Sequence, residues 1–90
     1  MPDGAHTVQY KKSVAKDLRK LPDAARKIIV VKIQSLAINP RPAGSTKLRG
    51  AVDLYRVRHT DYRIVYQIQE DRLIVMVIKV GHRREVYRDF

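Results

Sequence analysis

Apolar and polar positions follow two different periods along the chain, and the change of period predicts a helical half followed by a strand half. In the first half, Val14, Leu18 and Leu21 lie at i, i+4 and i+7, the spacing of one apolar stripe on a helix. Pro22 interrupts that helix and suits the first turn of a second one. Residues 6–10, HTVQY, alternate weakly and predict a short edge strand before the first helix.

The second helix is expected to run from about Pro22 to Ile38. Its apolar stripe is wide, which predicts contacts on two sides, with the first helix and with a sheet. The stripe comprises Ala25, Ile28, Ile29, Val30, Val31, Ile33 and Leu36. Residues 39–46, NPRPAGST, end this helix because a residue before proline avoids the helical region, and we expect them to form a loop.

In the second half the period becomes two, as in strands whose alternate side chains face opposite sides of a sheet. Residues 54–59, LYRVRH, place Tyr55 and Val57 on one face and Arg56 and Arg58 on the other. In residues 62–69, YRIVYQIQ, one face comprises Tyr62, Ile64, Tyr66 and Ile68, and the opposite face Arg63, Val65 and Gln67.

A third strand is predicted for residues 73–80, LIVMVIKV, which are apolar on both faces, as expected inside a sheet. The turns between the three strands are short, which predicts antiparallel pairing. We therefore expect a single domain over residues 1–90 with an α+β architecture. In it, two N-terminal helices pack on one face of a small, mainly antiparallel sheet.

Composition narrows the class of protein. The ninety residues contain no cysteine, which excludes disulfides and thiolate zinc sites. The longest apolar run, Leu73 to Ile78, is far shorter than the roughly 20 residues that a membrane span needs. The N-terminal residues also lack the apolar stretch of a signal peptide. We therefore expect a soluble, cytoplasmic protein with no membrane partner.

The net charge of +10, from 19 Lys and Arg against nine Asp and Glu, is the strongest feature of the composition. On charge alone, such an excess attracts any polyanion, whether nucleic acid, an acidic protein or a membrane surface, and solubility alone is the alternative explanation. The excess is spread over both halves of the chain and so belongs to the folded surface. No cluster of His, Asp and Glu has the spacing of a metal site, and we expect neither metal nor cofactor.

The face of the sheet that the helices leave uncovered is predicted to be cationic, because Arg56, Arg58 and Arg63 all point to it. Like charges across a sheet repel each other. A guanidinium group binds a phosphate through two parallel hydrogen bonds. We expect these arginines at the surface, and this face of the sheet therefore predicts a phosphate-bearing ligand. Two alternatives stay open: charges that protect an edge strand from aggregation, and pairing of Arg63 with Asp61 or Glu70.

The residues that follow the third strand add a second group of candidates at the rim of this face. Lys79 joins it if its parity matches, and an aromatic ring at Tyr87 would either stack on bases or pack on the core. Arg84 is more simply explained as a solvent-facing partner of Glu85. His82 either caps the strand end or acts as an acid or base, since an unperturbed imidazole titrates near neutrality.

Two stretches of sequence resemble a known family. Residues 47–68, KLRGAVDLYRVRHTDYRIVYQI, followed by residues 77–87, VIKVGHRREVY, resemble the RelE toxins of bacterial and archaeal toxin–antitoxin systems. The order of helices and strands also matches, and the resemblance covers nearly the whole chain. RelE-like toxins bind in the ribosomal A site and cut the mRNA there, whereas related members of the superfamily poison DNA gyrase.

The resemblance implies a function and two kinds of partner. It implies a ribosome-dependent endoribonuclease toxin of a type II toxin–antitoxin system, with the ribosomal A site and mRNA as target and a cognate acidic antitoxin as partner. The alternative on the same fold is a DNA gyrase-inhibiting, ParE-like toxin that performs no chemistry. A plain basic RNA-binding module is a third reading.

The resemblance also implies roles for individual residues. The expected catalytic residues are Arg56, Arg58, Arg63, Arg83 and Tyr87. Among them Arg63 would stabilise the phosphate, Arg83 would act as general acid, and Tyr87 would stack on the RNA. The expected RNA-binding residues are Lys47, Arg49, Lys79 and Arg84.

The implied reaction is metal-free attack by the 2′-hydroxyl on the adjacent phosphate, which leaves a 2′,3′-cyclic end. Some members of the family have lysine at the positions of Arg56 and Arg58. Arginine keeps its proton in proteins and is a poor general base, although it stabilises a charged transition state. The base therefore stays open between His82 and a group of the ribosomal RNA.

Overall fold

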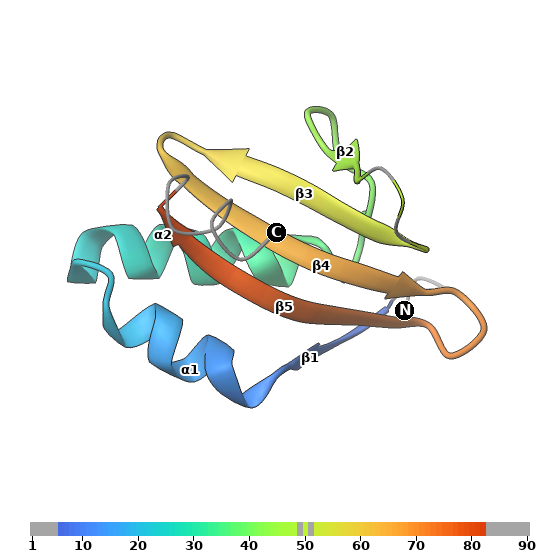
Figure 1. The fold of residues 1–90 in the computed structure, drawn as a ribbon, viewed down its shortest axis with the longest axis horizontal. Helices are drawn as coiled ribbons and strands as arrows, with labels where there is room; N and C mark the ends of the chain where they lie inside the picture. The colour runs from blue at the N-terminus through green and yellow to red at the C-terminus, as the bar shows by residue number, and fades with distance from the viewer. Residues whose placement is uncertain (1–5, 49, 51, 83–90) are drawn as a thin grey trace.

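The computed structural model of the protein describes residues 6–48, 50 and 52–82. Within them, one sheet of five strands has two helices packed against it (Figure 1). The elements are β1 (Thr7–Tyr10), α1 (Lys12–Arg19), α2 (Asp23–Ser35), β2 (Thr46–Lys47), β3 (Leu54–His59), β4 (Tyr62–Gln69) and β5 (Ile74–His82). The predicted α+β class is confirmed.

The strands follow the order β1-β5-β4-β3-β2 across the sheet. Strands β2 to β5 pair with their neighbours in antiparallel fashion, while β1 runs parallel to β5 at one edge. The predicted bounds of β3 and β4 are confirmed, and β1 forms the edge strand that the weak alternation of residues 6–10 suggested. Strand β2 was not predicted, and β5 continues two residues beyond Val80.

The core lies between the helices and one face of the sheet. The buried cluster comprises Val14, Leu21, Ile29, Ile33, Leu36, Val57, Ile64, Tyr66, Ile68, Val75, Val77 and Val80. Helix α2 ends at Ser35, before its predicted end at Ile38, because the chain tightens there into i→i+3 hydrogen bonds such as that from the Ala37 amide to the Gln34 carbonyl. The helices thus leave the other face of the sheet to the polar residues of β3 and β4.

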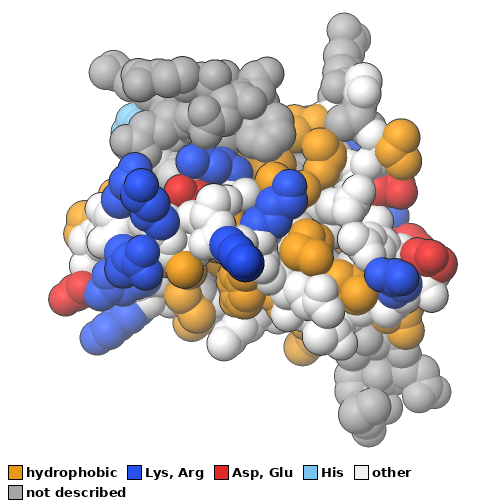
Figure 2. All heavy atoms as spheres, turned by 60° about the horizontal axis from the view of Figure 1, so that its bottom comes forward, with side chains coloured by type: hydrophobic (Ala, Val, Ile, Leu, Met, Phe, Trp, Pro, Cys, Tyr) orange, Lys and Arg blue, Asp and Glu red, His pale blue; other side chains and the backbone are white. Residues whose placement is uncertain are grey.

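The wide apolar stripe of α2 is only partly buried. Ile29 and Ile33 have no exposed surface, whereas Ile28 and Val31 are 48% and 65% exposed, so the expected second set of contacts is wrong for these two residues. Lysine and arginine side chains surround apolar patches on the face that Figure 2 shows. Among the residues that the structure describes, no helix is both long and apolar enough to cross a membrane.

A β-bulge in β5 sets the orientation of its C-terminal half. Val65 pairs with Lys79 while the next residue of β4, Tyr66, pairs with Val77, so Ile78 is an extra residue. Beyond the bulge, Gly81 lies directly across from Arg63. The neighbour of Arg63 on this strand is therefore a residue without a side chain.

Candidate functional site

Three arginines lie on the face of the sheet away from the helices. In the antiparallel pairing of β3 and β4, Arg58 lies directly opposite Arg63, and Arg56 lies opposite Val65. The alternate positions, Val57 and Ile64, pair with each other and belong to the helix-side core. The predicted division of the two strands into an apolar face and an arginine face is therefore confirmed.

The three arginines line one open hollow of about 350 Å³, which we call the arginine hollow. Its other wall comes from the segment before and within β2, comprising Ala43, Gly44 and Thr46. Thr46 reaches this wall because it pairs with Arg56 and so shares its face. Sequence reasoning missed these wall residues, and their only signal was the small side chains at the end of the predicted loop.

Arg63 is the buried member of the set, with 6% of its surface exposed. Its Nη1 donates hydrogen bonds of 3.2 Å to the carbonyl oxygens of Thr60 and Tyr62. Its Nε is buried and has no hydrogen-bond partner among the described residues. The expectation that Arg63 sits on the surface is therefore wrong.

The alternative pairing of Arg63 with Asp61 or Glu70 is also wrong, because its guanidinium donates to carbonyl oxygens and Glu70 pairs with Arg41 instead. Those bonds direct Arg63 back onto the β3–β4 turn that precedes it. Thr60 in this turn has φ +52°, a left-handed conformation that β-branched residues rarely adopt. The strained β3–β4 turn and the Arg63 guanidinium thus lie side by side at the end of the hairpin.

The arginine hollow has a strongly positive lining. The three arginines are the charged members of the described residues that line it. Two of the three, Arg58 and Arg63, face each other across the strands, an arrangement that costs stability in a sheet. Among residues 6–48, 50 and 52–82 no cluster of three or more His, Asp or Glu could hold a metal ion. The hollow is therefore suited to a polyanion.

Two of the predicted RNA-binding lysines lie apart from the hollow. Lys47 is exposed and pairs with Tyr55, so it points to the opposite face from Arg56. The Lys79 Nζ donates to the Asp17 Oδ1 over 3.2 Å and so reaches α1. The other Asp17 carboxylate oxygen accepts a 3.1 Å hydrogen bond from the Val80 amide.

His82 also lies outside the arginine hollow. It pairs with Tyr62 on the helix side of the sheet, and the two rings meet edge to face with their centroids 6.2 Å apart. With Asp17 and Lys20 it lines a separate hollow of about 150 Å³. The structure therefore does not bring His82 to the three arginines. The remaining predicted site residues, Arg49, Arg83, Arg84 and Tyr87, lie outside the described residues.

Comparison with known proteins identifies the family. Residues 8–87 match the family model described as ParE toxin of type II toxin–antitoxin system, parDE. The chain is 34% identical to the mRNA interferase toxin RelE of Escherichia coli, over 94% of this chain and 93% of that one. This chain belongs to the RelE/ParE family of toxins. It is also 32% identical to the putative toxin RelE1 of Methanocaldococcus jannaschii, over 91% and 94% of the two chains.

Solved structures agree with this family assignment. The intact RelBE toxin–antitoxin complex of E. coli contains a chain that superposes with a TM-score of 0.75 at 32% identity, covering 87% of this chain and 96% of that chain. The archaeal RelE–RelB complex of Pyrococcus horikoshii gives a TM-score of 0.78 at 30% identity, with 88% and 96% covered. The RelE-like fold expected from the sequence is thereby confirmed.

Proposed function

We propose that this protein is the toxin of a type II toxin–antitoxin system and that it is a ribosome-dependent endoribonuclease that cuts mRNA. The observation that carries the proposal is the arginine hollow, which Arg56, Arg58 and Arg63 of two neighbouring strands line together. Relatives at similar length are named mRNA interferase RelE, which supports the same activity here.

The proposed chemistry is attack by the 2′-hydroxyl oxygen of the RNA on its own adjacent phosphorus. The new 2′-oxygen–phosphorus bond forms as the bond to the 5′-oxygen of the next nucleotide breaks. Negative charge builds up on the phosphate oxygens, and the positive charges of Arg56, Arg58 and Arg63 around the hollow stabilise it. The burial of Arg63 strengthens its contribution, because less water screens the interaction.

The base in this reaction must be a group other than the three arginines, since a protonated guanidinium cannot accept a proton. We propose Arg83 as the donor to the leaving 5′-oxygen and Tyr87 as the ring that stacks on a base, as the resemblance implies. The base that takes the 2′-hydroxyl proton is either His82 or a group of the ribosomal RNA. The position of His82 on the helix side favours the ribosomal group.

We propose two partners besides the mRNA, namely the A site of the ribosome and an acidic antitoxin. Relatives have been solved as complexes with RelB antitoxins. A net charge of +10 and a cationic hollow make an acidic partner favourable. We further propose that the protein acts in the cytoplasm, where ribosomes and mRNA meet.

A second candidate function is inhibition of DNA gyrase, which the description of the matching family model as a ParE toxin favours. Pulsed expression in bacterial cells separates the two. The proposed nuclease should stop translation and leave mRNA cut within open reading frames, and Arg58→Ala should make these cuts far fewer. Intact mRNA together with DNA damage would instead support the gyrase inhibitor.

A further inference from the structure

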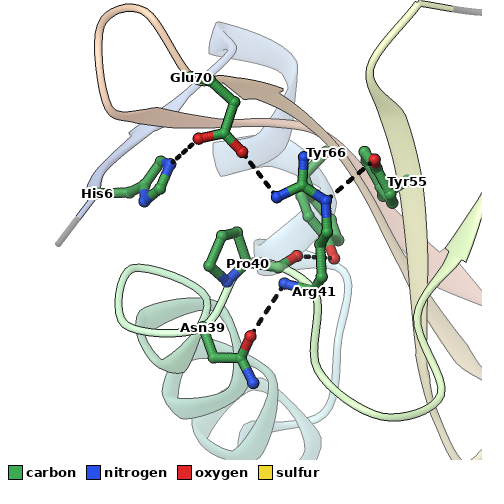
Figure 3. A network of polar contacts seen from close by, with 7 residues as sticks. All are labelled: His6, Asn39, Pro40, Arg41, Tyr55, Tyr66 and Glu70. Carbon is green, nitrogen blue, oxygen red and sulfur yellow. Dashed lines mark hydrogen bonds and ion pairs between the residues drawn. The ribbon is translucent and has the colours of Figure 1, made fainter. Parts of the chain in front are cut away.

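Arg41 forms a bridge between the loop after α2 and the sheet (Figure 3). Its Nη1 donates a 2.7 Å hydrogen bond to the Glu70 Oε1, and its Nε donates a 3.2 Å bond to the Tyr55 hydroxyl. Its guanidinium carbon also lies 5.2 Å from the centroid of the Tyr55 ring. The side chain therefore links three separate segments: the loop, β3 and the turn after β4.

A second connection fixes the loop one residue earlier. The Tyr66 hydroxyl donates a 2.6 Å hydrogen bond to the Pro40 carbonyl (Figure 3). Tyr66 has no exposed surface, and its ring stacks on Tyr55 with centroids 6.0 Å apart. The same two rings that hold Pro40 and Arg41 thus pack on each other within the sheet.

The bridged loop leads directly to the wall of the arginine hollow. Ala43 and Gly44, two and three residues after Arg41, line the hollow, and Thr46 lines it while pairing with Arg56. Gly44 has φ +90°, which only glycine adopts without strain. The position of this wall relative to the arginines is therefore set by the loop, which the Arg41 bridge ties to the sheet.

The bridge contributes little to global stability by its nature. Arg41 and Glu70 are about half exposed, and ion pairs at the surface add little to the stability of a fold. The Arg41 guanidinium lowers the pKa of the Glu70 carboxyl, so the pair stays charged at neutral pH. Its effect is therefore expected on the geometry of the loop more than on the folding of the domain.

We propose that Arg41, held by Glu70 and Tyr55, is a positioning residue that sets the Ala43–Thr46 wall of the arginine hollow and thereby the fit of the bound RNA. The proposal rests on the proposed nuclease function. Arg41 would act through the wall and would not touch the scissile phosphate.

The first test does not depend on activity. Arg41→Gln and Glu70→Gln should each speed amide hydrogen exchange in residues 42–47 by about tenfold or more, as expected for a loop freed to open locally. Exchange in residues 62–69 should stay unchanged. Arg72→Gln, in the same turn as Glu70 but without an ion pair among the described residues, is the matched control. Unchanged exchange in residues 42–47 of both variants would overturn the proposal.

The second test uses cleavage of one defined mRNA on purified ribosomes. Each variant should cut more slowly at saturating ribosome concentration by about tenfold, since small misplacements near a reacting group are costly. The distribution of cut positions should also change, which a loss of folded protein alone would not cause. The double variant should be no slower than either single variant, because both remove one bridge.

The positioning role of Arg41 and the nuclease function can be disproved separately. A wild-type protein that leaves ribosome-bound mRNA intact would remove the proposed function, and the exchange experiment would still test the bridge. A wild-type protein that cuts mRNA, with both variants cutting at the same positions and rate, would overturn the positioning role and leave the nuclease standing.

Discussion

Arg58 and Arg63 lie directly opposite each other on neighbouring antiparallel strands, one exposed and the other buried. Two like charges in this relationship oppose formation of the sheet. The hairpin that joins them contains Thr60 in a left-handed conformation, which adds strain at the same end. Structural cost concentrated beside a cationic hollow is typical of a functional site.

Replacing Arg58 should affect stability and activity in opposite directions. Arg58→Ala should lower mRNA cleavage on ribosomes by about 10²–10³, the usual effect of removing one electrostatic donor. Its melting temperature should be equal to or above that of the wild type, because the repulsion on Arg63 is relieved and the side chain is exposed. Calorimetry and a cleavage assay on the same preparation measure both. A variant that loses activity only in proportion to lost folding would oppose a catalytic role.

Replacing Arg63 should damage both properties. Arg63→Ala removes two hydrogen bonds to the carbonyls of Thr60 and Tyr62 and leaves a gap in a buried position. We expect the free energy of unfolding to fall by about 1–3 kcal/mol, in contrast to Arg58→Ala. Cleavage should fall by about 10²–10³ in the fraction that remains folded. Denaturant titration gives the first quantity. A neutral effect on stability would mean that Arg63 is exposed in solution.

The contrast between these arginines marks the limit of what the sequence reveals. The strict alternation in residues 54–59 and 62–69 assigns Arg56, Arg58 and Arg63 to one face, and the structure has them there. Alternation says nothing about depth, so the burial of Arg63 against the carbonyls of its own hairpin was not predictable.

Other features could not be predicted because they leave no periodic pattern of apolar and polar residues in the sequence. Strand β2 has two residues, too few for any alternation, yet it brings Thr46 beside Arg56. The bulge at Ile78 shifts the later side chains of β5 to the opposite faces of the sheet. Because β5 is apolar on both faces, the alternation of apolar and polar residues does not reveal this shift. That change places His82 on the helix side, where the sequence left its role open.

His82 gives a direct test of that placement. His82→Gln should change the maximal cleavage rate by less than about threefold, well below the 10²–10⁴ that a general acid or base contributes. Its pH–rate profile between pH 5 and 8 should match that of the wild type. If the variant instead lost the dependence of its cleavage rate on pH in this range, His82 would be the base.

Tyr66 should give the protein a distinct dependence on alkaline pH. Burial raises the pKa of its phenol from 10.0 to about 12. Since the folded-state pKa is the higher one, the stabilisation by the neutral phenol is complete below pH 10 and is lost as the pH rises towards 12.

The variant Tyr66→Phe removes this titration and the hydrogen bond to the Pro40 carbonyl. At pH 8 it should be less stable than the wild type by about 0.5–1.5 kcal/mol, the usual net value of one hydrogen bond. Between pH 10 and 12 the difference should shrink, because only the wild type must ionise a buried phenol. Denaturant unfolding at a series of pH values measures it. A difference that is constant with pH would contradict the assigned burial of this hydroxyl.

The chemical identity of the RNA ends tests the central claim most directly. Purified protein is added to ribosomes stalled with a defined codon in the A site, and both fragments of the mRNA are analysed. Attack by the 2′-oxygen, stabilised by the arginine hollow, predicts a 2′,3′-cyclic phosphate on the upstream fragment and a 5′-hydroxyl on the downstream fragment. Arg58→Ala should form both products about 10²–10³ more slowly. A 5′-phosphate on the downstream fragment would contradict this mechanism, and uncut mRNA would contradict the proposed function itself.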